Sequence, residues 1–223
     1  LYTVAFINIM ISITQKVKHL QLNWHTTAIM FIVCVFLYLA CTSAVYEIQA
    51  RILMQQLQGF HFIAHWTTAI LIAVVLYRFM SLILKNRSTG TDNLHFITWI
   101  FCEVAVIFLS IEIHLVTNDI FFAANNPLEN IQRIYIKTGL PILWGVCSFI
   151  FMWLGMRYKY RTLRIISLSL FTLTLLKLFI FDIRNIPAGG KIAAFFCLGV
   201  LLLVVSFMYQ RLKKIIIDEE KLD

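Results

Sequence analysis

Long apolar runs recur along this chain from one end to the other. A membrane-spanning helix needs about 20 consecutive, mostly apolar residues. Runs of this kind lie near 1–14, 24–46, 62–84, 94–117, 135–156, 162–182 and 190–212, and the first is too short to cross a bilayer. Hydrophobic residues make up 61% of the sequence and charged residues 13%, a composition outside the range of soluble domains. The sequence therefore predicts an all-α fold, a polytopic transmembrane helix bundle of about seven spans.

Lysine and arginine gather on alternate connections between these runs. The basic connections hold Lys16 and Lys18, then Lys85 and Arg87, then Arg157, Lys159, Arg161 and Arg164, and finally Arg211, Lys213 and Lys214. By the positive-inside rule these connections are cytoplasmic, so we expect the C-terminus on that side of the membrane. The formal net charge of +8 then reflects orientation. Because this charge is dispersed over short connections, we expect no nucleic-acid partner.

The chain has no linker rich in Pro, Gly or Ser and no low-complexity tract. We therefore expect one transmembrane helical domain over residues 1–214 and a charged cytoplasmic tail over 215–223. Because the sequence starts at Leu1 inside an apolar run, we interpret it as the C-terminal portion of a longer chain. Its expected partners are the lipid bilayer and either preceding spans or other membrane-protein subunits.

Sequence motifs give no direct sign of an enzyme. The chain has no GxSxG, HExxH or Walker A pattern, each of which would place a nucleophile, a metal or a phosphate. The five cysteines are scattered through apolar runs, as buried small hydrophobic residues are. We therefore assign no catalytic residue and no cofactor.

Ionisable residues inside the apolar runs are the main candidates for a functional site, because a charge within a bilayer costs a few kcal/mol. These residues are Glu103, Glu112 and His114 in the fourth run and Lys177 in the sixth, with Asp182 at its outer end. A rise of about 1.5 Å per residue brings Glu112 and Lys177 to a similar depth. We predict a buried polar cluster of these five residues in the outer half of the membrane. A structural ion pair between Glu112 and Lys177, and a proton or cation step there, both remain open.

Two further groups of side chains are candidates for binding. His61 and His65 are four residues apart, so both rings can face one side of a helix, a spacing found in zinc sites. Hydrogen bonding to headgroups and loops is the alternative, so the pair is only a weak metal candidate. On the opposite side of the membrane, lipid-headgroup contacts are predicted for Arg157, Lys159, Arg161 and Arg164.

The C-terminal third carries an ordered set of residues: Trp144 to Gly155, Arg161 and Arg164, Lys177 and Asp182, then Phe195, Gly199, Leu202, Tyr209 and Arg211. In this order and spacing, residues 141–214 resemble the end of a bacterial family of predicted polytopic membrane proteins, domain-of-unknown-function family 2339 (DUF2339). The resemblance implies a multi-pass protein of the bacterial inner membrane with further spans before this region. The chain departs from the family pattern at Lys191, where an Arg is usual. The family implies no activity, so Lys177 and Asp182 are motif positions without a role.

Three classes of function fit these observations. We favour a non-enzymatic, transporter-like or scaffold subunit of a cell-envelope assembly. The alternative is a membrane-embedded transferase that acts on a lipid-linked substrate at the periplasmic face, with Glu112, His114, His61 or Asp119 as acid and base. The third is a purely structural partner of a larger complex. An enzyme should show a polar cavity where imidazole and carboxylate converge, and a carrier should show a continuous polar path reaching Glu103. A scaffold should show Glu112 and Lys177 paired and dry, with its large apolar faces covered by neighbours.

Overall fold

The computed structural model describes residues 24–86, 92–122 and 127–178, together with the single positions 192, 195, 196, 199, 200, 203 and 206. Four helical stretches are long and apolar enough to cross a membrane: Phe31–Leu53, Ile63–Lys85, Leu94–Phe121 and Leu128–Arg157. The predicted all-helical membrane class is therefore confirmed, while the count of seven spans and the cytoplasmic C-terminus stay predictions. The run at 1–14, Asp182, the tail at 215–223 and most of 190–212 lie outside the described residues.

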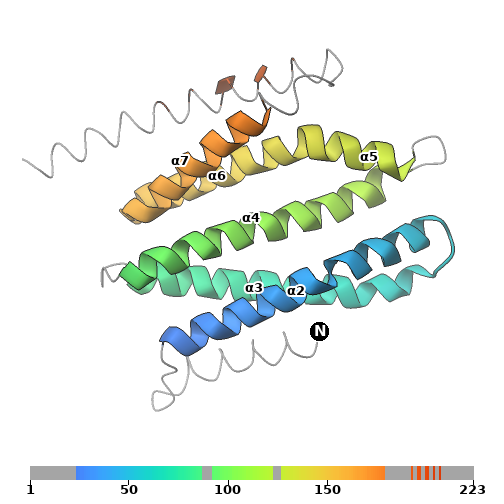
Figure 1. Cartoon of the computed structure of the whole chain (residues 1–223), viewed down its shortest axis with the longest axis horizontal. Coiled ribbons are helices and arrows are strands. Elements are labelled where there is room, and N and C mark those ends of the chain that lie inside the picture. Colours follow the sequence, from blue (N-terminus) through green and yellow to red (C-terminus); the bar gives the residue numbers. More distant parts are fainter. Residues whose placement is uncertain are drawn as a thin grey trace, which may run out of the picture. The chain divides into compact units, whose positions relative to one another are not determined.

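The elements follow in the order α2 (Trp24–Leu53), the 3-10 helix η1 (Gly59–Phe62), α3 (Ile63–Asn86), α4 (Asp92–Phe121), α5 (Leu128–Ile134), the π-helix η3 (Tyr135–Gly139), α6 (Leu140–Arg157) and α7 (Arg161–Lys177). The chain divides into two compact units, the first ending at Leu128 and the second starting at Glu129. Helices α2 to α4 lie in the first unit, and α6 and α7 in the second (Figure 1).

Two helices of the first unit are longer than the sequence predicts. Helix α2 runs to Leu53 rather than 46, and α4 runs to Phe121 rather than 117. The added turns contain polar residues such as Gln49 and Asn118, which are typical of a connection rather than a span. Both are nevertheless buried, at 2% and 0% exposure, because they bond to each other across the two helices. Tertiary contacts have thus overridden the local hydropathy signal.

Helices α2, α3 and α4 pack against one another, with α2 and α4 parallel and α3 antiparallel to both (Figure 1). At one end, Phe31 of α2, Phe79 of α3 and Phe101 of α4 meet in an aromatic cluster. Phe31 and Phe79 are stacked with ring centroids 4.4 Å apart, and all three rings are at most 4% exposed. Such contacts add to the packing of apolar rings, so the cluster fixes the register of the helices at this end.

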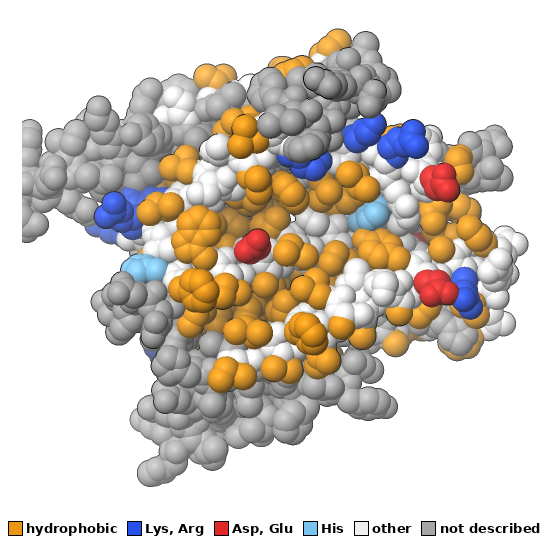
Figure 2. Space-filling model, viewed as in Figure 1, with side chains coloured by type: hydrophobic (Ala, Val, Ile, Leu, Met, Phe, Trp, Pro, Cys, Tyr) orange, Lys and Arg blue, Asp and Glu red, His pale blue; other side chains and the backbone are white. Residues whose placement is uncertain are grey.

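Large hydrophobic side chains also point away from this core. Phe36 on α2 is 70% exposed and Phe96 on α4 is 67% exposed, and Figure 2 shows hydrophobic side chains over much of the visible face of the described helices. A soluble monomer rarely exposes so large an apolar surface. In a lipid bilayer the same side chains face a solvent that is as apolar as they are.

The second unit is built on an antiparallel helix pair. Ser148 of α6 donates to the Ser167 carbonyl of α7 at 3.1 Å, and Gly155 lies against α7 near the turn that joins the helices. A Cβ added at Gly155 would lie 2.8 Å from Arg164 Cγ and 3.0 Å from the Arg164 backbone nitrogen. Gly155 is therefore the residue that lets the two backbones approach closely.

Helix α6 is preceded by one turn of π-helix, and Pro141 follows this turn directly after Leu140. Together they leave one backbone carbonyl without a hydrogen bond from its own helix. The Leu140 N–H donates five residues back, to the Tyr135 carbonyl. The next donor in that series would be the N–H of residue 141, which proline lacks. The carbonyl of Ile136 therefore receives no such bond from its own helix, in a region where an unsatisfied backbone group is costly. Another group has to supply the donor.

We predict that Gly155→Val destabilises the α6–α7 pair, because the new methyl groups collide with Arg164 backbone. Overpacking of this kind costs about 1–3 kcal/mol, so the midpoint of thermal unfolding in detergent should fall. Gly59→Val is the matched control, because a Cβ at Gly59 meets nothing within 4 Å. Equal midpoints for the two variants would contradict the close contact.

Candidate functional site

Polar side chains of three helices meet near the end of the first unit that lies away from the aromatic cluster. We call them the interhelical polar network; its members are Tyr38, Tyr46 and Gln49 of α2, His65 of α3, and Glu112, His114, Asn118 and Asp119 of α4. Eighteen residues separate Phe31 from Gln49 and also Phe101 from Asp119. Because α2 and α4 are parallel and rise equally per residue, Gln49 lies level with Asp119, as Phe31 does with Phe101.

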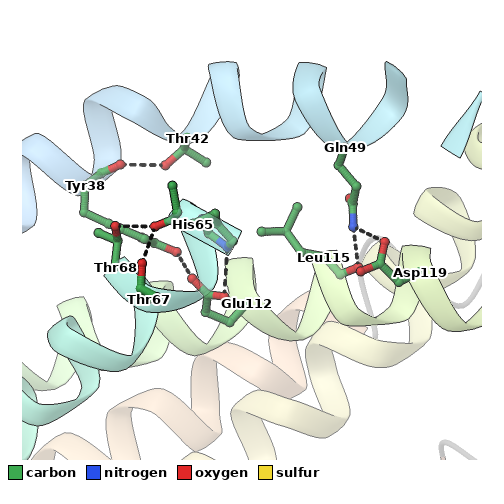
Figure 3. Close-up of polar contacts among 10 residues, drawn as sticks. Tyr38, Thr42, Gln49, His65, Thr67, Thr68, Glu112, Leu115 and Asp119 are labelled. Atoms are coloured by element: carbon green, nitrogen blue, oxygen red, sulfur yellow. Dashed lines mark hydrogen bonds and ion pairs between the residues drawn. The ribbon is translucent and has the colours of Figure 1, made fainter. Parts of the chain in front are cut away.

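Glu112 is the centre of the network. Its carboxylate lies between the hydroxyl of Tyr38 and the ring of His65 (Figure 3). Tyr38 donates to Oε1 at 2.5 Å, and His65 Nε2 lies 3.2 Å from Oε2. The side chains of His65 and Glu112 are 7% and 12% exposed. Both carboxylate oxygens thus contact a neighbouring helix, and the contact with His65 is an ion pair when the imidazole is protonated.

His114 and Tyr46 form the next contact along the same two helices. The Tyr46 hydroxyl lies 2.8 Å from His114 Nδ1, and the two rings also pack, with centroids 5.2 Å apart. The hydroxyl can donate to this nitrogen or accept from it, depending on the histidine tautomer. Either way, the contact joins α2 to α4 beyond Glu112.

An amide-centred group completes the network one to two turns further along. Gln49 Nε2 donates to both the Leu115 carbonyl and Asp119 Oδ1, each at 2.7 Å (Figure 3). Its Oε1 accepts from Asn118 Nδ2 at 3.1 Å. One glutamine therefore uses both ends of its amide on a single neighbouring helix. Such interhelical hydrogen bonds are worth about 0.6–2 kcal/mol each within a membrane.

The structure joins only part of the predicted polar cluster. Glu112 and His114 both contact α2, through Tyr38 and Tyr46 respectively. Glu103 is exposed on the first unit, and Asp182 lies outside the described residues. Lys177 belongs to the second unit, so its pairing with Glu112 stays a prediction.

Of the two histidines predicted as a weak metal site, the structure describes the side chain of only one. His65 pairs with Glu112, while the side chain of His61 is outside the described part of the chain. Among the described residues, no group of three His, Cys, Asp or Glu side chains could hold a metal ion.

Lys177 has a clear partner within its own unit. Its Nζ donates to the carbonyl of Ile136 at 2.7 Å, the carbonyl that Pro141 leaves without a backbone donor. A charged donor makes a stronger hydrogen bond than a neutral one. Lys177 therefore ties the end of α7 to the π-helix that precedes α6.

Sequence reasoning identified Glu112, His114 and Lys177 but missed Tyr38, Tyr46 and Gln49. A signal for the α2 residues was present: Tyr38, Thr42 and Gln49 recur at spacings of four and seven, which is one helical stripe. The sequence also shows Pro141, which removes the backbone donor that Lys177 replaces at the Ile136 carbonyl. It does not show the π-helix on which this replacement depends.

We predict that Gln49→Leu loosens α2 from α4. The variant removes three hydrogen bonds and leaves Asn118 buried beside an apolar side chain, which should cost about 1–3 kcal/mol. The unfolding midpoint should fall, whereas Gln56→Leu, at an exposed turn residue, should leave it unchanged. A fully stable Gln49→Leu protein would show that the amide contacts contribute nothing.

Lys177→Met should lower stability or assembly, because the Ile136 carbonyl then loses its donor, while Lys177→Arg should preserve part of it. Hydrogen bonds to charged groups are worth about 1.5–3 kcal/mol. Thermal unfolding measures the loss, and Lys85→Met, at an exposed residue near the end of α3, is the control for removing one lysine. Equal tolerance of Met and Arg at position 177 would exclude a role for the charge.

Comparison with known proteins agrees with the helical, apolar architecture. Residues 1–212 match the family described as predicted membrane protein (DUF2339), which is a longer match than the resemblance over 141–214. No curated protein and no solved structure matches the chain. Because the match covers nearly all of the sequence, the chain belongs to the DUF2339 family of predicted membrane proteins.

Proposed function

We propose that this protein is a non-enzymatic scaffold subunit of a cell-envelope assembly in the bacterial inner membrane. One observation carries the proposal: the Glu112 carboxylate and the Gln49 amide both bond to partners on neighbouring helices. Both oxygens of Glu112 and both ends of the Gln49 amide have partners within the network. Buried polar groups that are satisfied in this way specify a unique arrangement of helices.

The surroundings of the network favour the same conclusion. A general base needs a lone pair directed at a substrate, and ligand sites are concave with a few converging polar groups. The pocket that borders Tyr38 is otherwise lined by apolar residues of α2, α3 and α4. The geometry is that of contacts between helices rather than of an open reaction centre.

A carrier of protons or cations is the second candidate. The observation in its favour is the pairing of His65 with Glu112 inside the predicted spans, with Tyr38 on the other carboxylate oxygen. Intramembrane titratable groups of this kind form proton relays in pumps and transporters. A transferase at the periplasmic face would use the same imidazole and carboxylate as acid and base, and is the third candidate.

Two variants of Glu112 separate these functions. A glutamine can still accept from Tyr38 and can donate to a neutral His65, whereas a leucine can do neither. For a scaffold we expect Glu112→Gln to assemble and unfold almost like the wild type. Glu112→Leu should lower the unfolding midpoint, because it leaves two buried partners without bonds, at a cost of about 1–3 kcal/mol each.

The discriminating measurement uses the full chain in proteoliposomes that enclose a pH-sensitive dye. A scaffold gives no pH change beyond that of empty vesicles under an imposed gradient. A carrier acidifies the lumen, and Glu112→Gln then abolishes the change although the protein stays folded, which would overturn the proposal. Glu47→Gln is the control, because Glu47 is exposed and pairs only locally with Arg51.

A further inference from the structure

We propose that the turn between α6 and α7 binds the phosphate group of an anionic phospholipid. The binding residues are Arg157, Lys159, Arg161 and Arg164, here called the basic hairpin. The proposal is independent of the scaffold function, since either a scaffold or a carrier could hold such a lipid.

Charge is the first argument. The sequence contains no Asp or Glu between Glu129 and Asp182, although the basic hairpin lies in the middle of that stretch. Among the described residues, no carboxylate forms an ion pair with Arg157 or Arg161. A group of like charges repels itself, so it is stabilised by an anion from outside the hairpin.

The side chain of Arg157 is held in a position that suits a headgroup. Its guanidinium carbon lies 5.3 Å from the centroid of the Trp153 ring and 6.0 Å from that of Tyr158. A stacked guanidinium presents its N–H edge outward, where it can bind phosphate in a bidentate manner. Trp153 is 46% exposed, and exposed tryptophans of membrane helices favour the headgroup region. The tryptophan thus places the arginine at phosphate depth.

The backbone of the hairpin is closed and well defined. Tyr158, Lys159 and Tyr160 each donate a backbone hydrogen bond to the end of α6. Lys159 takes the left-handed conformation, with a φ of 52°, which completes the reversal into α7. Close packing of Gly155 against the Arg164 stem then brings the fourth cation to the same turn. These cations are held by a compact turn rather than by a disordered tail.

The ligand follows from the location of the hairpin. It joins α6 to α7 at the end of an apolar stretch long enough to span a membrane, Leu128–Arg157, so its cations lie where lipid phosphates lie. Basic residues next to a membrane segment attract anionic lipids, each cation improving binding by about fivefold. A soluble phosphate or a nucleic acid would not need the exposed tryptophan, so the lipid is the better match.

The test uses the full chain in detergent, titrated with dioleoyl phosphatidylglycerol, dioleoyl phosphatidylcholine or inorganic phosphate. We expect phosphatidylglycerol to raise the unfolding midpoint more than phosphatidylcholine, and the difference to shrink in high salt. Inorganic phosphate should have little effect. An equal shift with both lipids, or a full shift with inorganic phosphate alone, would overturn the proposal.

Variants locate the site. Arg157→Gln combined with Arg161→Gln should weaken phosphatidylglycerol binding by about tenfold or more. The control, Arg51→Gln combined with Arg133→Gln, removes the same charge from two exposed residues outside the basic connections and should retain the affinity. If the double variant misfolds, the single change Arg161→Gln at an exposed side chain gives the answer, with an expected loss of about fivefold. Equal loss in hairpin and control variants would show attraction by net charge alone and would refute a defined site.

Discussion

A carboxylate inside a membrane helix is tolerable only with partners, and the first unit is organised around that requirement. Glu112 takes one hydrogen-bond partner from α2 and one from α3, so the position of three helices depends on a single side chain. The remaining polar contacts run along α2 and α4 in the same register. Removing one partner of a buried ion pair costs more stability than forming the pair contributes. A different packing of these three helices, which would leave Glu112 without its partners, is therefore disfavoured.

In the second unit the group that needs a partner is a backbone carbonyl, and a lysine ammonium supplies that partner. Proline in a helix interior leaves a backbone carbonyl without its donor, and within a membrane water does not replace it. The lysine at the end of α7 supplies the donor from a neighbouring helix. An ammonium that looks unfavourable in an apolar segment is therefore explained by a defect in the adjacent backbone, rather than by a negative charge alone.

Hydropathy predicted the class of fold and the approximate positions of five helices, because apolar length is a property of the chain itself. It placed the ends of α2 and α4 too early, because the Gln49 and Asn118 amides can be buried in a helix interface only when they hydrogen-bond to each other. The network was predictable at Glu112 and His114, where an ionisable residue interrupts an apolar run. It was not predictable at Tyr38 or Tyr46, because a tyrosine in a span is ordinary until its partner is known. The π-helix at η3 depends on hydrogen-bond register, which residue composition does not encode.

The parallel pairing of α2 and α4 has a consequence for how the chain is made. Tyr38 and Glu112 are 74 residues apart in sequence, and Gln49 and Asn118 are 69 residues apart. When α2 first enters the bilayer, the helix that satisfies its amide and hydroxyl groups has not yet been synthesised. Those groups must stay near water or the insertion machinery until α4 emerges from the ribosome, so integration of α2 is coupled to translation of α4.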